Sequence, residues 1–388
     1  MSAPLAPWLR DIRRALHREP ELGLACAETA ARIRAELRAL GLRPRAGGAQ
    51  TGILCDLEFG RRNAKRVLLR ADTDGLPLTE SGGPARRGGY ASRRAGVMHA
   101  CGHDGHVAML LGAARLLVEN PPASGAVRLM FQPGEEGPGG AAPMVEAGAL
   151  RGVRAAYGLH LWNRLPTGSL AFRAGPVMAA CDEFRITVIG QGGHGAHPAE
   201  TRDTVLCAAQ IVTRLQEIVA REVAPGDPAV VSVCAIRGGE AFNVIPAEVA
   251  LRGTLRSFNE ATRALLGRRV REIADGVART AGLRARVEVV PGYPALVNDE
   301  GLDERAREML VDLPGVREIL TPPQEMGAED FAYLAAEIPS LFIFVGARGG
   351  AARAAGPHHS PSFDFDEAAL PLGARLLHRL AVRTLAGA

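Results

Sequence analysis

The sequence predicts an α/β fold: a mainly parallel sheet with helices on both faces, together with a smaller inserted α+β domain. Over residues 1–183, short apolar strands alternate with amphipathic helices, which is typical of a parallel sheet covered on both sides. From residue 184 to 293 the order changes to strand, helix, strand, strand, helix, strand. The earlier pattern resumes over residues 294–388, so we expect one discontinuous domain with residues 184–293 inserted into it.

The spacing of apolar residues predicts the elements of the first domain. In chain order these are helix, helix, strand, strand, helix and strand, at residues 8–19, 28–40, 53–59, 67–71, 105–119 and 127–131. Asp72 and Asp74 directly follow the second strand, and the glycine-rich turn QPGEEGPGG follows the third. Ligands of open α/β sheets gather at the carboxyl ends of strands, so we expect a binding site among these polar residues.

The inserted segment begins with apolar residues at every second position from Phe184, the pattern of a half-buried strand. The elements after it are a helix, two strands, a helix and a strand, at residues 204–221, 229–236, 244–257, 260–281 and 285–290. This order predicts a ferredoxin-like sandwich. After Pro291 a helix, a strand at 341–345 and a closing helix complete the first domain. Stretches rich in arginine or alanine, at 81–95 and 347–356, are expected as surface loops.

Composition argues against several classes of protein. The chain has 388 residues, a formal net charge of +4 and 4% aromatic residues, without a basic stripe, which disfavours nucleic acid as a partner. No apolar stretch approaches the roughly 18 residues that span a bilayer, and the first residues lack the core of a signal peptide, so we expect a cytoplasmic protein without a membrane partner. Six scattered cysteines form no CxxC pair, so disulfides are not expected. Lys65 is the only lysine and lies outside a GK[ST] loop, and no GxSxG elbow is present, which argues against phosphate-loop, Schiff-base and serine-hydrolase chemistry.

The densest group of chemically active residues is MHACGHDGH, at residues 98–106. It places Cys101, His103, Asp104 and His106 within six positions at a strand-to-helix junction. Thiolate, imidazole and carboxylate groups are the ligands that borderline divalent metals prefer. Each residue alone could be a buried thiol or a solvated histidine, but packing rarely gathers several such groups, so we interpret the cluster as a metal site.

Glu135 and Glu136 form a second signal, on a turn between glycines that follows an apolar strand. Paired glutamates are usually solvated surface residues. Here the position at a strand end favours function, because adjacent side chains on a turn point in different directions. One of them can then bind a metal while the other holds water, as metal-assisted hydrolysis requires.

Three further places are ambiguous from the residues alone. His160 lies in the apolar run AAYGLHLW, where it could be a ligand or a core histidine with its hydrogen bonds satisfied. His358 and His359, in GPHHSPSFDF, could be ligands or loop residues. Asp72 and Asp74 could form a turn or could orient metal ligands through hydrogen bonds.

Eight segments, in chain order, resemble those of the N-acyl amino acid amidohydrolases: LLRADTDGLPLTE, GVMHACGHDGH, FQPGEEGPGG, YGLHLW, GQGGHGAHP, FNVIPAEVALRGTLRSF, MGAEDFAYL and HHSPSFDF. This branch contains hippurate hydrolase, bacterial aminoacylases and plant auxin-conjugate hydrolases, relatives of carboxypeptidase G and aminoacylase-1 type metallopeptidases. The resemblance runs from about His17 to Glu367. It implies a zinc-peptidase-like catalytic domain with an inserted lid or dimerisation domain. It also implies metal-dependent hydrolysis of the amide bond of N-acyl amino acids, of the hippurate or N-acetyl type, to a carboxylic acid and a free amino acid.

The resemblance assigns a cofactor and a base. It implies two divalent metal ions, of zinc, manganese, cobalt or nickel, with Cys101 in the bridging position. The implied metal ligands are Cys101, His103, Glu136, His160 and His359. Glu135 matches the general base.

Other matched positions support the site or contact the substrate. Asp74 and Asp104 match residues that hold metal ligands in place. His194 matches a histidine of the lid that stabilises the oxyanion, in the same or in the partner subunit. Asn243 and Arg256 match lid positions near the substrate carboxylate. The implied partners are a small-molecule N-acyl amino acid and further copies of the chain, in a homodimer or homotetramer.

The sequence departs from the family pattern in two places. Many relatives have a further histidine after the HP dipeptide of the lid, where this chain has Ala199. The stretch 81–94 is also longer and richer in arginine than usual. We therefore expect altered substrate contacts near both.

Three alternatives remain open from the sequence. An N-acyl-diaminopimelate deacetylase or a dipeptidase would use the same base and metals with different pocket contacts. A catalytically silent homologue would be a metal-dependent binding module, although such a protein normally loses at least one ligand and all are present here. A structural zinc site would be enclosed by four closely spaced Cys or His residues, whereas these ligands span residues 101–359.

Overall fold

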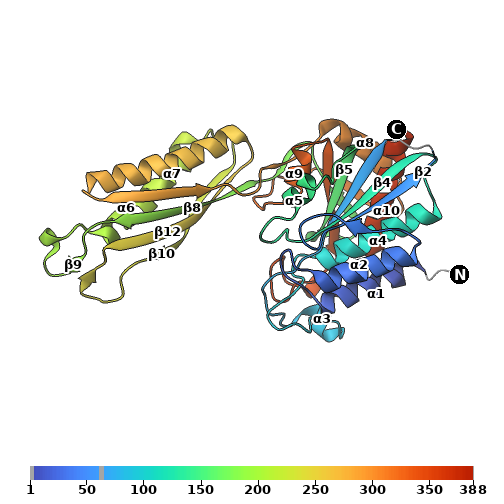
Figure 1. The fold of residues 1–388 in the computed structure, drawn as a ribbon, viewed down its shortest axis with the longest axis horizontal. Coiled ribbons are helices and arrows are strands. Elements are labelled where there is room, and N and C mark those ends of the chain that lie inside the picture. Colours follow the sequence, from blue (N-terminus) through green and yellow to red (C-terminus); the bar gives the residue numbers. More distant parts are fainter. Residues whose placement is uncertain (1–3, 61–64, 388) are drawn as a thin grey trace. The chain divides into compact units, whose positions relative to one another are not determined.

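The computed structural model describes residues 4–60 and 65–387 (Figure 1), so residues 1–3, 61–64 and 388 of the predicted first domain lie outside the described part. The chain divides into two compact units. The first comprises Met1–Gly175, Val297–Pro323 and Asp330–Ala388, and the second comprises Pro176–Leu296 and Gln324–Glu329. Each unit has a hydrophobic core of its own.

Within the described residues, the first unit is built on an eight-stranded sheet in the order β1-β2-β4-β3-β5-β16-β6-β15. Its strands are β1 (Arg45–Ala46), β2 (Ile53–Phe59), β3 (Arg66–Asp72), β4 (Gly125–Gln132), β5 (Val153–Pro166), β6 (Ser169–Ala171), β15 (Glu318–Leu320) and β16 (Ser340–Arg348). The four central strands, β4, β3, β5 and β16, run parallel to one another, and β6 runs parallel to β15. The remaining pairings, β1 with β2, β2 with β4 and β6 with β16, are antiparallel. The parallel centre of the sheet confirms the predicted mainly parallel sheet.

Helices cover both faces of this sheet. They are α1 (Leu5–Arg18), α2 (Ala27–Ala39), α3 (Gly83–Arg87), α4 (His103–Glu119), α5 (Ala141–Glu146), α8 (Glu300–Leu310), α9 (Ala332–Ala335) and α10 (Ala369–Ala386). α1, α4, α8 and α10 bury apolar residues in one cluster on one face, for example Leu110 and Leu377. On the opposite face the ring of Phe331, which precedes α9, lies 5.4 Å from that of Phe342 on β16. No helix in the described ranges is long and apolar enough to cross a membrane.

The strands that carry the predicted site residues lie side by side. β3 ends at Asp72 and β4 ends at Gln132, and these two residues are partners in the parallel register. Arg70 of β3 is the partner of Gly158 on β5, two residues before His160. Because parallel strands end at the same edge of a sheet, polar segments far apart in the sequence meet here.

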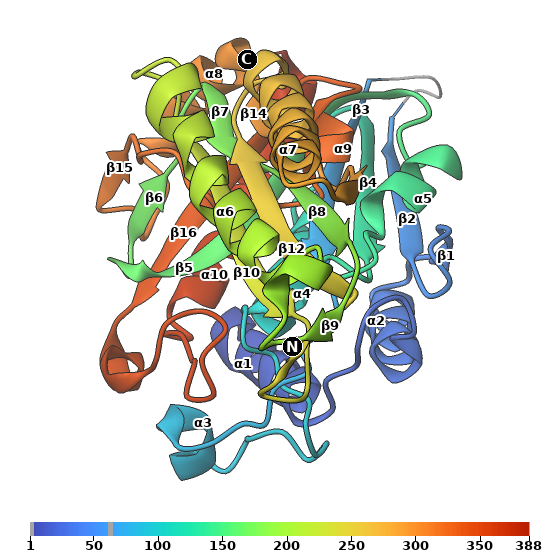
Figure 2. The ribbon, with the colours of Figure 1, turned by 90° about the vertical axis from the view of Figure 1, so that its left-hand side faces the viewer.

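Within the described residues, the main sheet of the second unit has four antiparallel strands in the order β10-β12-β8-β13, and two helices lie against one face (Figure 2). Its elements are β8 (Ala180–Ile189), α6 (Thr204–Glu217), β10 (Ala229–Arg237), β12 (Glu248–Ser257), α7 (Glu260–Thr280) and β13 (Arg284–Val290). The side chains of Asp203 and Asn259 accept hydrogen bonds from backbone N–H groups in the first turns of α6 and α7, which fixes where each helix begins. The chain order is that of the predicted ferredoxin-like domain.

The predicted strand at residues 244–257 is in fact two strands. β11 (Val244–Ile245) pairs with β9 (Gly193–His194), whereas β12 pairs with β8. Pro246 lies between them, and a proline has no backbone N–H with which to continue the ladder. The first part of this run therefore belongs to a separate two-stranded ribbon, and the rest belongs to the main sheet.

The stretch 81–95, expected as a surface loop, is partly helical and partly buried. It contains the short helix α3, and Tyr90 is only 6% exposed. The backbone N–H of Ser81 donates to the carbonyl of Pro361 at 2.8 Å. This stretch therefore packs against the loop that precedes α10.

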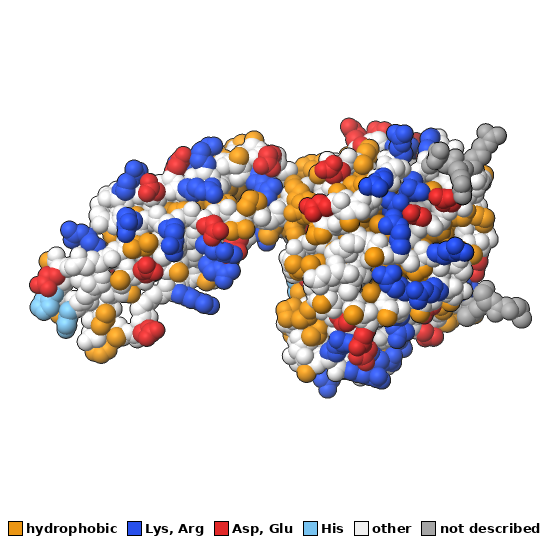
Figure 3. Space-filling view, in the orientation of Figure 1, with side chains coloured by type: hydrophobic (Ala, Val, Ile, Leu, Met, Phe, Trp, Pro, Cys, Tyr) orange, Lys and Arg blue, Asp and Glu red, His pale blue; other side chains and the backbone are white. Residues whose placement is uncertain are grey.

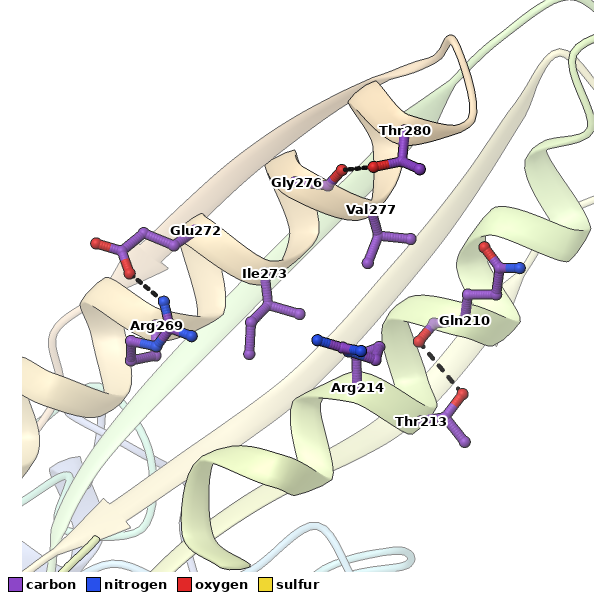
Figure 4. A pocket seen from close by; sticks show the side chains of 9 residues that line it. All are labelled: Gln210, Thr213, Arg214, Arg269, Glu272, Ile273, Gly276, Val277 and Thr280. Atoms are coloured by element: carbon purple, nitrogen blue, oxygen red, sulfur yellow. Dashed lines mark hydrogen bonds and ion pairs between the residues drawn. The ribbon is translucent and has the colours of Figure 1, made fainter. Parts of the chain in front are cut away.

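The surface is chemically mixed. On the face drawn in Figure 3, acidic and basic side chains are interspersed, in line with a net charge of +4. A groove of about 600 Å³ lies between α6 and α7, lined by side chains that include Gln210, Arg214 and Thr280 (Figure 4). Its only carboxylate, Glu272, pairs with Arg269, and its lining contains no histidine or cysteine. This groove therefore lacks the chemistry of a metal site.

A bidentate ion pair joins β2 to β4, and from it we predict an effect on stability. Arg128 donates from Nε to Oδ1 of Asp56 at 2.7 Å and from Nη2 to Oδ2 at 2.9 Å, and Arg128 is 4% exposed. We expect Asp56→Asn to lower the free energy of unfolding by about 1–3 kcal/mol at pH 7, because a buried guanidinium loses its counter-charge.

The same pair predicts a pH dependence. Burial raises the pKa of Asp56, but Arg128 outweighs burial and holds this pKa below its usual value. The stabilisation is thus present at neutral pH and is lost as the pH falls below about 4. Denaturant unfolding of the wild-type protein and of Asp56→Asn should give free energies of unfolding whose difference shrinks from pH 7 towards pH ~2. A difference that stays constant over this range would contradict the prediction.

Candidate metal centre

Cys101 and His103 lie where a loop turns into α4. Gly102 between them has a φ of 95°, a left-handed conformation that glycine adopts without strain. Cys101 is 8% exposed and His103 is fully buried. The ligand atoms of these two residues and of His160 all lie within 4.8 Å of one another.

Glu135 and Glu136 lie on the turn after β4, where Gly134 has a φ of 79°. Their two backbone N–H groups donate to the two carboxylate oxygens of Asp74, each at 3.0 Å. Oδ1 of Asp74 also lies 3.6 Å from Nδ1 of His103. Asp74 thus contacts two of the segments that carry predicted ligands.

His160 lies on β5, and its own strand holds its ring. Nδ1–H donates to the carbonyl of Leu161 at 2.7 Å, so Nε2 carries a lone pair. This Nε2 lies 3.3 Å from Sγ of Cys101. Burial lowers the pKa of His160 well below its usual value, which keeps the ring neutral, the form that binds metals. His358 donates from Nε2 to the same Leu161 carbonyl at 2.9 Å, so it supports this strand.

His359 reaches the site from the loop before α10. Its φ is 62°, which is uncommon for a residue other than glycine, and its N–H donates to the carbonyl of Ala100 at 2.8 Å. Its Nε2 lies 3.2 Å from Oε1 of Glu136. Backbone strain of this kind persists only where the surroundings fix it, and it clusters at functional sites.

Two groups of three potential ligands meet at Cys101. One is Cys101, His103 and His160, and the other is Cys101, Glu136 and His359; the ligand atoms of each group lie within 4.8 Å of one another. Metal bonds of about 2.0–2.3 Å put two ligands of one tetrahedral zinc ion about 3.3–3.8 Å apart. The distances of 3.3 Å from Cys101 to His160 and 3.2 Å from Glu136 to His359 are close to this. A thiol that belongs to both groups could serve two ions.

Unsatisfied atoms and excess negative charge occur at the same place. Both ring nitrogens of His103 and Oε1 of Glu136 are buried without a hydrogen-bond partner. Burial lowers the pKa of His103, but neighbouring carboxylates, Asp72 foremost, outweigh it and raise this pKa to about 10. Burial, reinforced by Glu136, raises the pKa of the Cys101 thiol well above its usual value. Divalent cations would satisfy these atoms and stabilise the thiolate, so the donor set fits metal ions.

His106 is close to this cluster but both of its nitrogens are engaged. Nδ1–H donates to Oδ1 of Asp72 at 2.6 Å, and Nε2 accepts the backbone N–H of Leu161 at 2.9 Å. His106 therefore links the end of β3 to β5 next to His160. Asp72 also accepts a hydrogen bond from Arg70 at 2.7 Å, so it supports the cluster through its neighbours.

The predicted residues of the second unit lie in two places. His194 is on β9, and the carbonyl of Asn243 accepts the N–H of Gly195 at 2.8 Å, so His194 and Asn243 share one ribbon. Nδ1 of His194 accepts the N–H of Ala196 at 3.0 Å, which leaves Nε2 of the exposed ring to donate. Arg256 is the next-to-last residue of β12 and donates to a backbone carbonyl at 3.2 Å. It lies at the other end of the main sheet from this ribbon.

Sequence reasoning missed the buried arginines behind the ligands, Arg13 and Arg70, together with Asp330. Asp104, predicted as a support, accepts hydrogen bonds from Nε of Arg13 and Nδ1 of His17, each at 2.8 Å. Arg70 donates to Asp330 at 2.8 Å as well as to Asp72. A signal was present for both arginines, because Arg13 lies on the apolar face of α1 and Arg70 interrupts the apolar run of β3.

Comparison with known proteins identifies the family. Residues 68–383 match the model of Peptidase family M20/M25/M40. The chain is 39% identical over 383 residues to "IAA-amino acid hydrolase ILR1-like 4" of Arabidopsis thaliana, covering 97% of this chain and 86% of that protein. It is 37% identical over 382 residues to "N-acetyl-L-cysteine deacetylase" of Bacillus subtilis, covering 98% and 89%.

A solved structure agrees with this assignment. The YXEP protein of Bacillus subtilis, described as a dinuclear metal binding peptidase from the M20 family, superposes with a TM-score of 0.84 at 33% identity, covering 98% of this chain and 99% of that one. The predicted fold class and the predicted family are both confirmed. The chain belongs to Peptidase family M20/M25/M40 and is a metal-dependent hydrolase.

Proposed function

We propose that the protein hydrolyses the amide bond of N-acyl amino acids, of the hippurate or N-acetyl type, to a carboxylic acid and a free amino acid. The observation that carries this proposal is the pair of ligand groups that share Cys101, with the buried Glu135 beside them. The substrate class is supported by two relatives whose names specify an amino acid conjugate and an N-acetyl amino acid.

The proposed cofactor is a pair of divalent ions of zinc, manganese, cobalt or nickel. The proposed ligands are Cys101, His103 and His160 for one ion and Cys101, Glu136 and His359 for the other. A mixed set of thiolate, imidazole and carboxylate ligands accepts several metals, which is why the proposal includes four. Asp74 and Asp104 are proposed to hold these segments in place.

The proposed chemistry divides the work between adjacent glutamates. When bound, the ions supply a Lewis acid for the acyl carbonyl and lower the pKa of a water molecule towards ~7. Glu135 takes the proton of the water as the new C–O bond forms, and returns it to the nitrogen as the C–N bond breaks, so that the amine leaves neutral. Glu136 is proposed as a ligand, because its Oε1 faces His359 at 3.2 Å. Asp74 holds both backbone N–H groups, so the two side chains keep separate directions.

His194 is proposed to donate from Nε2 to the oxyanion that develops on the acyl oxygen. Asn243 and Arg256 are proposed to contact the substrate carboxylate. All three belong to the second unit, but Arg256 lies at the other end of the main sheet from His194 and Asn243. This proposal therefore requires two copies of that unit at one active site, with the ribbon of His194 and Asn243 and the residue Arg256 supplied by different subunits.

The role of His194 predicts a loss of turnover without a loss of metal. We expect His194→Ala to lower kcat by about 10²–10³-fold, the usual effect of removing one oxyanion donor. His197 is a matched control, since it is exposed and its ring centroid lies 5.3 Å from that of His194. His197→Ala should keep kcat near the wild-type value. Equal effects of the two substitutions would contradict the assignment.

Removal of metal distinguishes a catalytic from a structural site. Each unit has its own apolar core, so the metal-free protein is expected to keep its far-ultraviolet circular dichroism while its hydrolytic activity is lost. Dialysis against a chelator, followed by addition of zinc or manganese, should restore activity. Unfolding on removal of metal would instead favour a structural zinc site.

The direct test of the function is amino acid release from a panel of substrates. The panel contains hippurate, N-acetyl amino acids, N-acyl-diaminopimelate and dipeptides, offered to the metal-free protein and to protein supplied with manganese, zinc or cobalt. Metal-dependent release from hippurate or N-acetyl amino acids is the expected result. Release from N-acyl-diaminopimelate or dipeptides alone would move the assignment to the related deacetylase or dipeptidase. No release by folded, metal-loaded protein would overturn the proposal in favour of a silent homologue.

A further inference from the structure

A fully buried arginine, Arg13 of α1, lies behind the candidate metal centre, with 0% of its surface exposed. Its Nε donates to Oδ2 of Asp104 at 2.8 Å, and its Nη2 donates to Oδ1 of Asp364 at 2.7 Å. Its Nη1 reaches Oε1 of Glu367 at 3.3 Å. One guanidinium therefore uses all three of its nitrogens on three carboxylates.

The two closest carboxylates belong to segments that carry proposed ligands. Asp104 follows His103 directly, and its Oδ1 accepts the backbone N–H of the next residue at 2.9 Å, in the first turn of α4. Asp364 lies on the loop of His359, where its Oδ1 also accepts the next backbone N–H at 2.9 Å. Its Oδ2 accepts the hydroxyl of Tyr90 at 2.7 Å. Each carboxylate thus ties the backbone of its own segment to the arginine.

The site of His359 requires such support. The side chain of His359 is 55% exposed, and its φ of 62° is a strained conformation. The hydrogen bond from its N–H to Ala100 fixes one side of the loop. Asp364, held by Arg13, fixes the other.

Arginine is suited to this position by its shape. Its planar fork offers donors in fixed directions, whereas a lysine ammonium is a single point of charge on a flexible stem. Aromatic rings flank the guanidinium, whose central carbon lies 4.3 Å from the ring centroid of Phe365 and 4.9 Å from that of Tyr90. These contacts further restrict the direction of the fork.

We propose that Arg13 is a positioning residue of the metal centre: by holding Asp104 and Asp364 at a fixed separation, it sets the distance between His103 and His359, which belong to the two ligand groups that share Cys101. This inference rests on the proposed ligand set. A purely structural arginine would affect stability alone, whereas a positioning residue controls the affinity for metal in a protein that remains folded.

The test is a zinc titration of metal-free Arg13→Lys protein, in competition with a chromophoric chelator. We expect the Kd for at least one of the two zinc ions to rise by about 10–100-fold, the effect typical of residues that orient ligands. Arg128→Lys is the matched control: Arg128 is 4% exposed in the same unit, and its partners are Asp56 and backbone carbonyls outside the ligand groups. It should lower the melting temperature but keep both Kd values for zinc.

The outcomes separate this inference from the ligand set. Wild-type protein that binds no zinc would overturn the ligand set and this inference with it. Normal wild-type binding, with Kd values for Arg13→Lys no weaker than those for Arg128→Lys, would overturn the role of Arg13 alone. If Arg13→Lys does not fold, the same titration is made on Asp364→Asn, which removes the charge that Arg13 holds. Unchanged zinc affinity in that variant would equally overturn the proposal.

Discussion

Replacement of Glu135 by glutamine is expected to lower kcat by about 10³–10⁴-fold while both metal ions stay bound. General acid–base catalysis contributes typically about 10²–10⁴-fold, and the upper part of this range applies because one carboxylate is proposed to act in two proton transfers. Glutamine has the same shape but cannot accept the proton. The backbone N–H of residue 135 still donates to Asp74, so the turn should keep its conformation.

The adjacent glutamate provides the control for this prediction. Glu136 lies in the group of Cys101 and His359, so Glu136→Gln should lower the metal content as well as the turnover. Elemental analysis of both purified variants, together with kcat at saturating substrate, separates the two roles. Near-normal turnover in Glu135→Gln would remove Glu135 as the base. A loss of one ion from this variant would make Glu135 a ligand, which its position within 4.8 Å of His103 and Glu136 also permits geometrically.

The meeting of the polar strand-end segments could be anticipated because it depends on local signals, whereas the ligand roles of His160 and His359 came only from the family resemblance. Strand ends are marked by a change from apolar to polar residues, and parallel strands bring their carboxyl ends to one edge. The segment after β3, the turn after β4 and His160 on β5 meet for this reason. The apolar pattern of a single strand is enough to locate its end. The polar residues at that end are therefore found without knowledge of any distant contact.

The supports of the ligands could not be derived in the same way. Arg13 lies on the apolar face of α1, four residues after Leu9 and four before His17. This position predicts a buried charge. The partner Asp364 is 351 residues away, and no local pattern specifies a contact at that separation. The same holds for Arg70 and Asp330, which are 260 residues apart. A sequence shows that a charge is buried but does not show what neutralises it.

The inserted domain shows a related limit. Alternation predicts its strands, but it also predicts a single strand over 244–257, because the apolar pattern continues across Pro246. The missing N–H of this proline divides the run, and β11 then pairs with β9 instead of with the main sheet. The separate ribbon that carries His194 and Asn243 follows from this division. The proline was therefore a stronger signal than the apolar pattern around it.

Loss of the shared thiol should have the largest effect of any single substitution. Cys101 belongs to both groups of three ligands, whereas each of the other four proposed ligands belongs to one of these two groups. Cys101→Ala is therefore expected to weaken the binding of both ions, and to lower turnover by at least about 10⁴-fold, since metal ions supply several kcal/mol of transition-state stabilisation and each 1.36 kcal/mol is tenfold in rate. Metal content and kcat of the purified variant test this expectation.

A buried cysteine outside the ligand groups shows whether the effect is specific. Cys55 on β2 is 0% exposed, and Cys55→Ala removes the same sulfur from a packed position of the same unit. This control should lose some stability, as other large-to-small changes in a core do, but should keep two ions per chain and normal turnover. By contrast, His160→Ala should lose the ion of one group only, because Glu136 and His359 still share the thiol with the other ion. Two ions per chain in Cys101→Ala would show that the two groups do not depend on a common ligand, and the shared thiol would then have no role in holding the pair of ions together.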